Sequence, residues 1–360
     1  MSEKQAEDLI MSSTDKEAEG LTASSSTSGE AVVQVERASG FDPTVQLLFE
    51  LTGVEPFSGG TVALASHPLK PQLFVSILEL GKVLVVCTET STVLSTLEVP
   101  EDFDEGPKNV AFDAASGCLA LMVDDCLTRW RCDGSTWTEL RSARVLREDF
   151  ESCDCLSADA AGRLLLDAEP PSWLLPGGAL EPVSLEPLAP EPPKPDDNDL
   201  DAVYRRQAWE ATTTDLSNAL LVACSDGGIF FYARDSRSAH FLEPGCSRAQ
   251  ELSVRNARLS RGIIVHMESN LPDQGCCCAA IGGGMFVVGC LEGDRDGDLA
   301  VWSFCPGKAP SLTQLQGFKS RPAQLDAVAA DAAGVLYLCV VEKWPDQRAI
   351  YRVLPIEQRN

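Results

Sequence analysis

The chain has acidic residues at alternate positions of one glycine-containing segment: Glu292, Asp294, Asp296 and Asp298. A tight loop can turn alternate carboxylates toward one hard cation, which is the chemistry of calcium loops. The later ligand positions of such a loop are filled here by Ala300 and Ser303, which carry no carboxylate. The pattern therefore favours an Asp-Gly turn between two strands over a metal site, and we expect no cofactor.

The chain contains 14 cysteines, and two groups of them are dense: Cys153-Asp-Cys155 and Cys276-Cys-Cys278. A zinc site usually needs two pairs with about two to four residues between partners, and neither group has that spacing. Six other cysteines lie inside apolar strand patterns: Cys87, Cys118, Cys224, Cys290, Cys305 and Cys339. These positions favour reduced thiols that pack as small buried apolar groups in a compartment that is not oxidising.

The three histidines, His67, His240 and His266, are the candidate imidazole bases. None lies in a recognisable motif with a serine or cysteine nucleophile, the pairing that covalent catalysis requires. The glycine run 282–284 lacks the Lys-Ser/Thr pair and the helix start of a phosphate-binding loop. The sequence therefore predicts a protein that is not an enzyme.

One unit of sequence occurs four times. Each copy consists of a strand that ends in Asp, a short turn closed by Gly or Asn, and a second strand of branched and aliphatic residues. The four copies are Val110–Leu121, Leu156–Leu166, Thr212–Val222 and Val328–Leu338, with the aspartates Asp113, Asp159, Asp215 and Asp331. We therefore expect a β-hairpin with turn residues at each of these corners.

The strand pattern continues past the first hairpin of each unit. Ala219–Ala233 contains a second strand, an Asp-Gly-Gly turn and a third strand, and Val93–Val99 supplies a fourth strand to the first unit. The turns after the first strands fall at His67, Asp113, Asp159, Asp215, Gly283 and Asp331. Four short strands in a unit of about 40 to 50 residues, repeated six times, predict an all-β protein, a six-bladed β-propeller with four-stranded antiparallel blades.

Two segments resemble the end of a WD40 repeat, in which an Asp-Gly turn leads into a strand with an aromatic residue: Ser225–Tyr232 and Asp296–Ser303. The resemblance extends over roughly residues 45–360 and implies a β-propeller of WD40-like type. The Gly-His and Trp-Asp dipeptides of that family are missing, so its His-Asp hydrogen-bond network is not implied. The Asp-Ala-Ala-Gly corners resemble equally those of other propellers, such as the NHL type.

The last unit is one strand short, because only Pro355–Asn360 follow the strand Ala349–Leu354. WD40-like rings close by lending an N-terminal strand to the last blade, and Val45–Thr52 is available for this role. Closure also removes an unpaired sheet edge. A seven-bladed ring is the alternative, because Arg261–Glu268 is a strand candidate inside a long insertion.

Composition separates a ring from less regular segments. We expect residues 1–40 to form a disordered acidic tail rich in Ser and Thr, and residues 41–360 to form the propeller. A Pro-rich acidic insertion lies near residues 185–200, and a locally basic insertion lies near residues 244–274. The net charge of −25 repels nucleic acid and anionic lipid. No signal peptide or transmembrane segment is recognised, so we expect an intracellular protein, cytoplasmic or nuclear, without nucleic-acid binding or membrane insertion.

These patterns predict a non-catalytic platform for protein–protein interaction, or a structural subunit of a multiprotein complex. The candidate partner-binding residues are the arginines of the basic insertion: Arg248, Arg255, Arg258 and Arg261. Packing of this insertion on the acidic ring is the alternative. Two other functions stay open, a metal-dependent hydrolase or lactonase whose metal lies among the repeated aspartates, and, by analogy, a nucleoporin-like or coat-like scaffold.

Overall fold

The structure is a computed structural model of the chain, and it describes residues 41–51, 62–100, 103, 105–133, 136–141, 144–146, 155–168, 170–186, 219–233, 238–252, 277–281, 285–292, 298–306, 308, 311–320, 322–343 and 346–355. The acidic tail expected at residues 1–40 lies outside this range, as does most of the insertions near 185–200 and 244–274. Within the described range, the one helix is the single 3-10 turn η1 (Leu78–Leu80), and no helix is long and apolar enough to cross a membrane.

Five sheets have four antiparallel strands each. The first consists of β2 (Val62–Ser66), β3 (Gln72–Ile77), β4 (Lys82–Cys87) and β5 (Thr92–Glu98). The second consists of β11 (Leu156–Ala158), β12 (Leu164–Leu166), β13 (Ser172–Leu174) and β14 (Leu180–Pro182). The third consists of β15 (Ala219–Ala223), β16 (Ile229–Ala233), β17 (Ser238–Leu242) and β18 (Gln250–Glu251).

The other two four-stranded sheets contain the C-terminal part of the chain. One consists of β19 (Cys277–Ile281), β20 (Met285–Glu292), β21 (Asp298–Phe304) and β22 (Ser311–Gln314). The closing sheet consists of β23 (Pro322–Ala330), β24 (Leu336–Lys343), β25 (Asp346–Pro355) and the N-terminal strand β1 (Phe41–Leu51).

A remaining sheet has five strands: β6 (Pro107–Asp113), β7 (Cys118–Val123), β8 (Cys126–Asp133), β9 (Thr136–Glu139) and β10 (Val145–Leu146). Its outer position is divided, because β9 and β10 pair with opposite halves of β8. The break is held by Arg144, which donates two hydrogen bonds to Glu139 (2.8 and 2.9 Å) and stacks on Phe103. The expectation of six or seven uniform four-stranded blades is therefore wrong, because the described residues form five four-stranded blades and one sheet of five strands.

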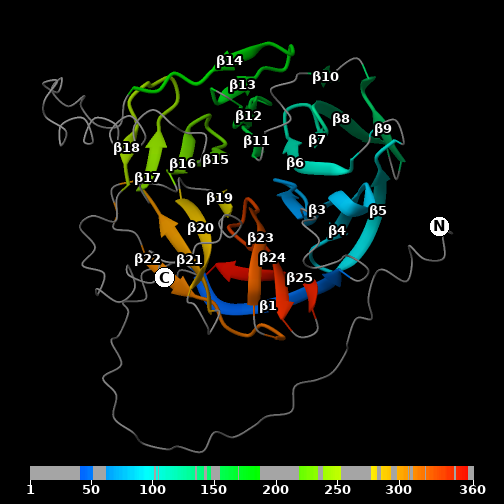
Figure 1. Cartoon of the computed structure of the whole chain (residues 1–360), viewed down its shortest axis with the longest axis vertical. Helices are drawn as coiled ribbons and strands as arrows, with labels where there is room; N and C mark the ends of the chain where they lie inside the picture. Colours follow the sequence, from blue (N-terminus) through cyan, green and yellow to red (C-terminus); the bar gives the residue numbers. More distant parts are fainter. Residues whose placement is uncertain are drawn as a thin grey trace, which may run out of the picture.

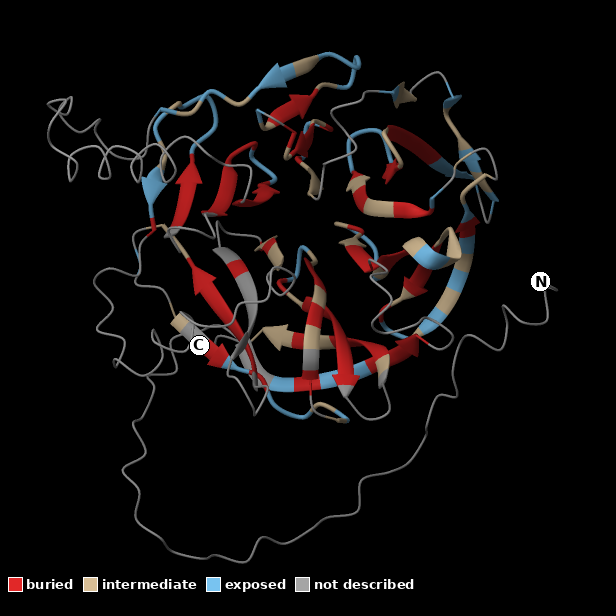
Figure 2. Cartoon of the chain, in the orientation of Figure 1, coloured by how far each residue is buried: buried red, intermediate tan, exposed pale blue. Residues whose placement is uncertain are grey.

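The sheets are arranged in a ring around a common axis (Figure 1). The innermost strands β2, β6, β11, β15, β19 and β23 contact one another in this order, and β23 contacts β2. Small residues such as Ala63, Ala111 and Ala279 let these strands approach closely near the axis, where the ring is narrowest. Larger residues fill the seams farther out, where each apolar cluster is built from the facing sides of two neighbouring sheets. Burial is accordingly greatest in the inner and middle strands (Figure 2).

The N-terminal strand closes the ring, as the sequence predicts. β1 pairs antiparallel with β25, in a register that places Val45 opposite Val353 and Leu51 opposite Arg348. The backbone N–H of Val45 also donates to the carbonyl of Gln316 at 2.8 Å, in the link between β22 and β23. The first and last described strands therefore belong to one sheet, and β25 has no free edge.

Candidate functional site

Three of the repeated aspartates are described, and each of them lies where an innermost strand ends and holds the turn that follows. Asp159 follows β11, and its Oδ1 accepts hydrogen bonds from the backbone N–H groups of Ala161 (3.0 Å) and Arg163 (2.8 Å). Its Oδ2 accepts a hydrogen bond from Nε of Arg163 at 2.7 Å. The guanidinium of Arg163 in turn lies over the ring of Trp173, 4.5 Å from its centroid. The carboxylate therefore organises both the backbone and the side chain that follow it.

Asp331 plays the same role after β23. Its Oδ1 accepts hydrogen bonds from the backbone N–H groups of Ala333 (2.9 Å) and Val335 (3.0 Å), and its Oδ2 accepts one from the hydroxyl of Tyr337 (2.9 Å). Burial raises the pKa of Tyr337 to about 12, so the hydroxyl keeps its proton and remains a donor at neutral pH.

Asp113 ends β6 and is almost completely buried. Its Oδ1 accepts hydrogen bonds from the N–H groups of Ala115 (3.0 Å) and Ser116 (3.1 Å), and its Oδ2 accepts the hydroxyl of Ser116 (2.6 Å). Oδ2 also forms a buried ion pair with Nη1 of Arg129 at 2.8 Å. Both carboxylate oxygens of this third aspartate are thus engaged within its own sheet.

These bonds limit the chemistry that the corners can perform. A metal held among the repeated aspartates needs carboxylate oxygens that face a common point, whereas those of Asp113, Asp159 and Asp331 accept hydrogen bonds from their own turns and from strands of their own sheets. Within the described ranges, no three His, Cys, Asp or Glu side chains are placed to share a metal ion.

The alternating acidic segment joins two paired strands. Glu292 lies opposite Asp298 across β20 and β21, the second and third strands of their sheet, as the hairpin interpretation predicts. Asp294 and Asp296 lie between them and fall outside the described residues.

In the sheet β15–β18, the innermost strand lies one strand later in the sequence than the repeat predicts. Asp215 lies outside the described residues, and the innermost strand of its sheet is β15, which the pattern assigned as a second strand. After β15, Cys224 occupies the place of the corner aspartate, because its N–H donates to the carbonyl of Gly228 (2.8 Å) as in the other turns. Asp226 supplies a carboxylate instead and accepts the N–H of Gly228 at 3.0 Å.

Neighbouring corners contact one another through glycines. A Cβ on Gly162 would lie 2.7 Å from Oδ1 of Asp113, which belongs to the preceding sheet. A Cβ on Gly227 would overlap Nη2 of Arg163 in the same way. Both glycines also have positive φ angles, +79° and +88°, which side chains disfavour. The turns at this end of the ring therefore pack directly on one another.

The described histidines serve packing and turn formation. The ring of His240 is buried and stacks on Phe231, with centroids 4.9 Å apart. His67 accepts the backbone N–H of Leu69 at its Nδ1, at 3.0 Å. His266 lies outside the described residues.

Eleven of the 14 cysteines are described with their side chains, and all eleven are free thiols. Burial raises the pKa of Cys224 to about 12, which keeps this thiol protonated and unreactive at neutral pH. Cys277 and Cys278 point to opposite faces of β19 and pack against different neighbouring sheets, and Cys155 packs in a third seam. Two members of the dense groups lie outside the described residues: Cys153 and Cys276.

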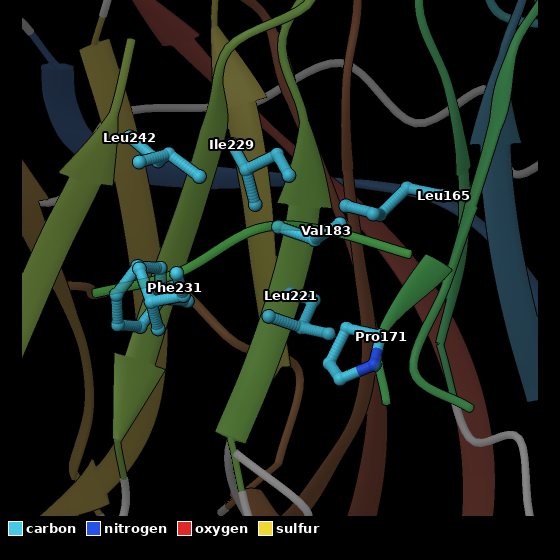
Figure 3. A pocket seen from close by; sticks show the side chains of 8 residues that line it. Leu165, Pro171, Val183, Leu221, Ile229, Phe231 and Leu242 are labelled. Atoms are coloured by element: carbon cyan, nitrogen blue, oxygen red, sulfur yellow. The ribbon is translucent and has the colours of Figure 1, made fainter. Parts of the chain in front are cut away.

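An apolar cavity lies in the seam between the sheets β11–β14 and β15–β18 (Figure 3). Leu165 and Pro171 line it from one side, and Leu221, Ile229 and Phe231 line it from the other. Its interior has room for about one water molecule, and all of its lining side chains are apolar. It is therefore a packing gap between two blades and offers neither the space nor the polar groups of a substrate site.

The candidate partner-binding arginines are only partly described. Arg248 is exposed in the link between β17 and β18. The neighbouring Ser247 contacts Glu186 through two hydrogen bonds: the N–H of Glu186 donates to the carbonyl of Ser247 (2.6 Å), and the hydroxyl of Ser247 donates to the carboxylate of Glu186 (2.7 Å). The described ends of the basic and acidic insertions therefore meet. The other three arginines lie outside the described residues: Arg255, Arg258 and Arg261.

Sequence reasoning missed a buried charge cluster at the ring closure. Arg348 on β25 is 1% exposed, and its guanidinium binds Asp326 of β23 (2.7 Å) and Glu79 of η1 (3.1 Å). Burial raises the pKa of Asp326, and Arg348 opposes this rise. The cluster joins the closing sheet to the sheet β2–β5. The signal in the sequence was Arg348 itself, because an arginine beside the apolar residues of β25 indicates a charge that needs a buried partner.

A second buried polar cluster lies on the other face of the closing sheet. Glu342 is completely buried, and its Oε1 accepts hydrogen bonds from the hydroxyl of Tyr351 and from the N–H of Ser320 (3.0 Å). Lys319, in the link before β23, forms an ion pair with Glu50 of β1. Burial raises the pKa of Tyr351. These contacts tie β1 and the link to the strands of the closing sheet.

The comparisons with known proteins support the fold. No protein-family profile and no curated protein sequence matches the chain. The chain is similar in structure to a luciferin-regenerating enzyme, with a TM-score of 0.52 and 11% identity over 86% of this chain and 95% of that one. It is also similar to a proposed gluconolactonase (TM-score 0.49, 12% identity, 88% and 94% covered) and to U3-55K (TM-score 0.46, 10% identity, 86% and 98% covered). At these identities the likeness shows the fold alone, and together with the ring of sheets it establishes an all-β propeller.

Proposed function

We propose that this propeller is a non-catalytic interaction platform that holds partner proteins in an intracellular assembly, in the cytoplasm or the nucleus. The observation that carries the proposal is the state of the corner carboxylates. The three described corner aspartates are the best candidates for chemistry at this end of the ring, and both oxygens of each accept hydrogen bonds from their own turn or from the strand that follows it. A rigid ring with loops at both ends suits binding, which needs no catalytic constellation.

The hydrolase or lactonase alternative needs a different arrangement of the same residues. A metal at the corners would have to displace Arg129 from Asp113 and Arg163 from Asp159, leaving two arginines without their partners. Removing one partner of a buried ion pair costs about 3 to 5 kcal/mol. The coat-like and nucleoporin-like alternatives are themselves platforms, so the same experiment addresses them.

Charge indicates which partners suit the platform. The net charge of −25 favours proteins with basic or mixed surfaces. The basic insertion is the exception, and we assign its arginines to the capture of an acidic neighbour: Arg248, Arg255, Arg258 and Arg261. An exposed cation such as Arg248 contributes little to folding, so its replacement should affect binding alone.

The test is affinity purification of the tagged full chain from its native cell, followed by mass spectrometry. We expect a stable set of co-purifying proteins, and a loss of some of them when the four arginines are replaced by Ala. The difference between the wild type and this variant should shrink at higher ionic strength, because salt screens the arginine contacts that only the wild type makes. The matched control replaces two exposed arginines, Arg131 on β8 and Arg141 just after β9, and should retain every partner.

One outcome would overturn the platform, and two others would overturn the role of the arginines. A monodisperse monomer that contains stoichiometric metal and no co-purifying protein would favour the hydrolase. A quadruple variant that keeps all partners at physiological salt would remove the arginines from the binding surface. A quadruple variant that loses its fold would instead show that these arginines pair with the acidic ring.

A further inference from the structure

Among the described corners of the ring, one differs from the others in residue size. The turns after β11 and β23 are Asp159-Ala-Ala-Gly162 and Asp331-Ala-Ala-Gly334, and the turn after β15 is Cys224-Ser-Asp-Gly227. The turn after β2 is His67-Pro-Leu-Lys-Pro71. Because the other three turns make the same connection with small residues, the large residues of this corner are not required by the turn itself.

Hydrogen bonds hold this corner in one conformation. The N–H of Leu69 donates to Nδ1 of His67 at 3.0 Å, and the N–H of His67 donates to the carbonyl of Gln72 at 2.9 Å. The N–H of Gln72 in turn donates to the carbonyl of Lys70 at 2.7 Å. The imidazole itself is fixed against the ring of Phe112, with centroids 4.2 Å apart. The backbone at Leu69 is therefore tied to the core of the seam beneath it.

The two residues at the tip of this corner are presented to solvent. Leu69 is 88% exposed, more than any other large apolar side chain in the described residues. Lys70 is also exposed, and no carboxylate in the described part of the chain forms an ion pair with it. Pro68 and Pro71 flank the pair and restrict its backbone. A preorganised apolar anchor loses little conformational entropy when a partner binds it.

We propose that Leu69 and Lys70 form a docking knob for a protein partner with an acidic surface. Leu69 enters an apolar pocket of the partner, and Lys70 pairs with a carboxylate at the rim of that pocket. Because no carboxylate of the described residues pairs with Lys70, its charge favours an acidic surface at this point, although the net charge of −25 favours basic or mixed surfaces over the rest of the chain. This inference rests on the proposed platform function and assigns part of its binding surface.

The first test places a photo-crosslinking amino acid, p-benzoylphenylalanine, at position 69 of the full chain. Irradiation of the native complex should link this position to a partner segment that contains apolar residues and at least one Asp or Glu. The matched control carries the same group at position 94, because Leu94 is 50% exposed on the outer strand β5. Crosslinks from position 94 should not reach that segment.

The second test measures the affinity of the purified crosslinked partner for the wild-type chain and for variants. Leu69→Ala should weaken binding about tenfold or more, as expected for a truncated anchor. Lys70→Glu should also weaken it and should reduce the dependence of affinity on salt. Leu94→Ala should bind like the wild type. All variants should melt at the wild-type temperature, because the altered side chains are exposed.

The outcomes separate this proposal from the platform function. If the wild-type chain forms a complex and Leu69→Ala binds equally tightly, the docking knob is wrong and the platform stands. If the wild-type chain forms no complex at all, the platform itself is wrong. A crosslink from position 69 to a basic segment, or to a second copy of this chain, also contradicts the assignment of an acidic partner.

Discussion

Single residues matter most at the corner turns, where one sheet packs on the next. Gly227 has a φ of +88°, and a Cβ there would overlap the guanidinium of Arg163. Gly178 has a similar φ of +83° but has no atom within 4 Å of its Cβ position. A side chain at either position would strain the backbone, but only a side chain at Gly227 would also collide with a neighbouring sheet.

We predict that Gly227→Ala destabilises the protein more than Gly178→Ala does. Backbone strain at positive φ should cost about 1 to 2 kcal/mol at both positions, and the overlap with Arg163 should add about 1 to 3 kcal/mol at Gly227 alone. Urea unfolding of both variants measures the difference in the free energy of unfolding. Equal losses would mean that Arg163 moves aside without cost.

His67 is expected to make stability depend on pH. Burial, and to a lesser degree Lys70, lower the pKa of His67 below its usual value of 6.5. The unfolded chain therefore takes up the proton first as the pH falls, which lowers stability from about pH 6.5 down to the lowered folded-state pKa. Above that window, His67 is neutral in both states and has no effect.

The prediction is checked with His67→Phe, which can keep the ring contact with Phe112 and cannot titrate. Between about pH 7.5 and pH 5.5, the wild type should lose more free energy of unfolding than the variant. Other groups titrate equally in both proteins, so the difference reports His67. Parallel stability curves would contradict the prediction.

At the scale of elements, the closing sheet depends on buried charge. Arg348 joins β25 to β23 through Asp326 and to η1 through Glu79, so three elements share one guanidinium. On the opposite face, Lys319 and Glu50 connect the link before β23 to β1. The edge where the ring closes is therefore held by ion pairs as well as by the strand ladder.

We predict that Arg348→Met destabilises the protein by about 3 to 5 kcal/mol, because it leaves Asp326 and Glu79 without their cation. The double variant Arg348→Met/Asp326→Leu should recover part of this loss, since it also removes a buried charge. Arg141→Met is the control. The side chain of Arg141 is 81% exposed, so its ion pair with Glu139 should contribute less than about 1 kcal/mol to stability. Thermal unfolding of the three variants tests the order. A double variant less stable than Arg348→Met would contradict the assigned role.

At the scale of the whole molecule, ring closure connects residues that are far apart in the chain. The pairing of β1 with β25 covers the edge of the closing sheet, and the seams on both sides of that sheet contain β1 residues such as Val45 and Phe49. Loss of β1 would expose the edge of β25 and open two seams.

A chain that starts at Gly53 is therefore expected to aggregate or to unfold without a cooperative transition. A chain that starts at Phe41 keeps β1 and should melt like the full chain, because residues 1–40 are predicted to bury little apolar surface. Calorimetry and light scattering of the two truncations provide the measurement. A cooperative melt of the shorter chain at the full-length temperature would disprove the role of β1.

The local parts of the fold were predictable from the sequence. The turns Asp159–Gly162 and Asp331–Gly334 are each formed by an aspartate and by a glycine three residues later. The aspartate accepts hydrogen bonds from backbone N–H groups close by in the sequence, so the turn can be predicted from a few adjacent residues. The strand missing from the last unit and the suitability of Val45–Thr52 to replace it were also visible, because both follow from counting strands. Burial of Cys118, Cys224 and Cys339 followed from their apolar neighbours, whereas Cys87 and Cys305 are only partly buried.

Other features depend on contacts between distant residues, and only the tertiary structure decided them. Hairpins within a blade resemble one another in sequence, so the choice of β15 as an innermost strand appears only where Cys224 takes the place of a corner aspartate. The split of the outer strand into β9 and β10 depends on the contact of Arg144 with Phe103 across a loop. The exposed fraction of Leu69 likewise depends on how the hydrogen bonds of His67 hold the turn.

The sequence by itself determined the all-β class, the repeated hairpins, the closing strand and the acidic charge, because turn chemistry, strand alternation and composition are local properties. The tertiary structure decided the strand count of each sheet, the partners of the corner carboxylates and the burial of Arg348. These features arise when residues hundreds of positions apart meet: Arg348 binds Glu79 only because the ring brings the closing sheet beside the sheet β2–β5. No local pattern specifies such a contact, since the energy of a buried charge depends on every group that surrounds it.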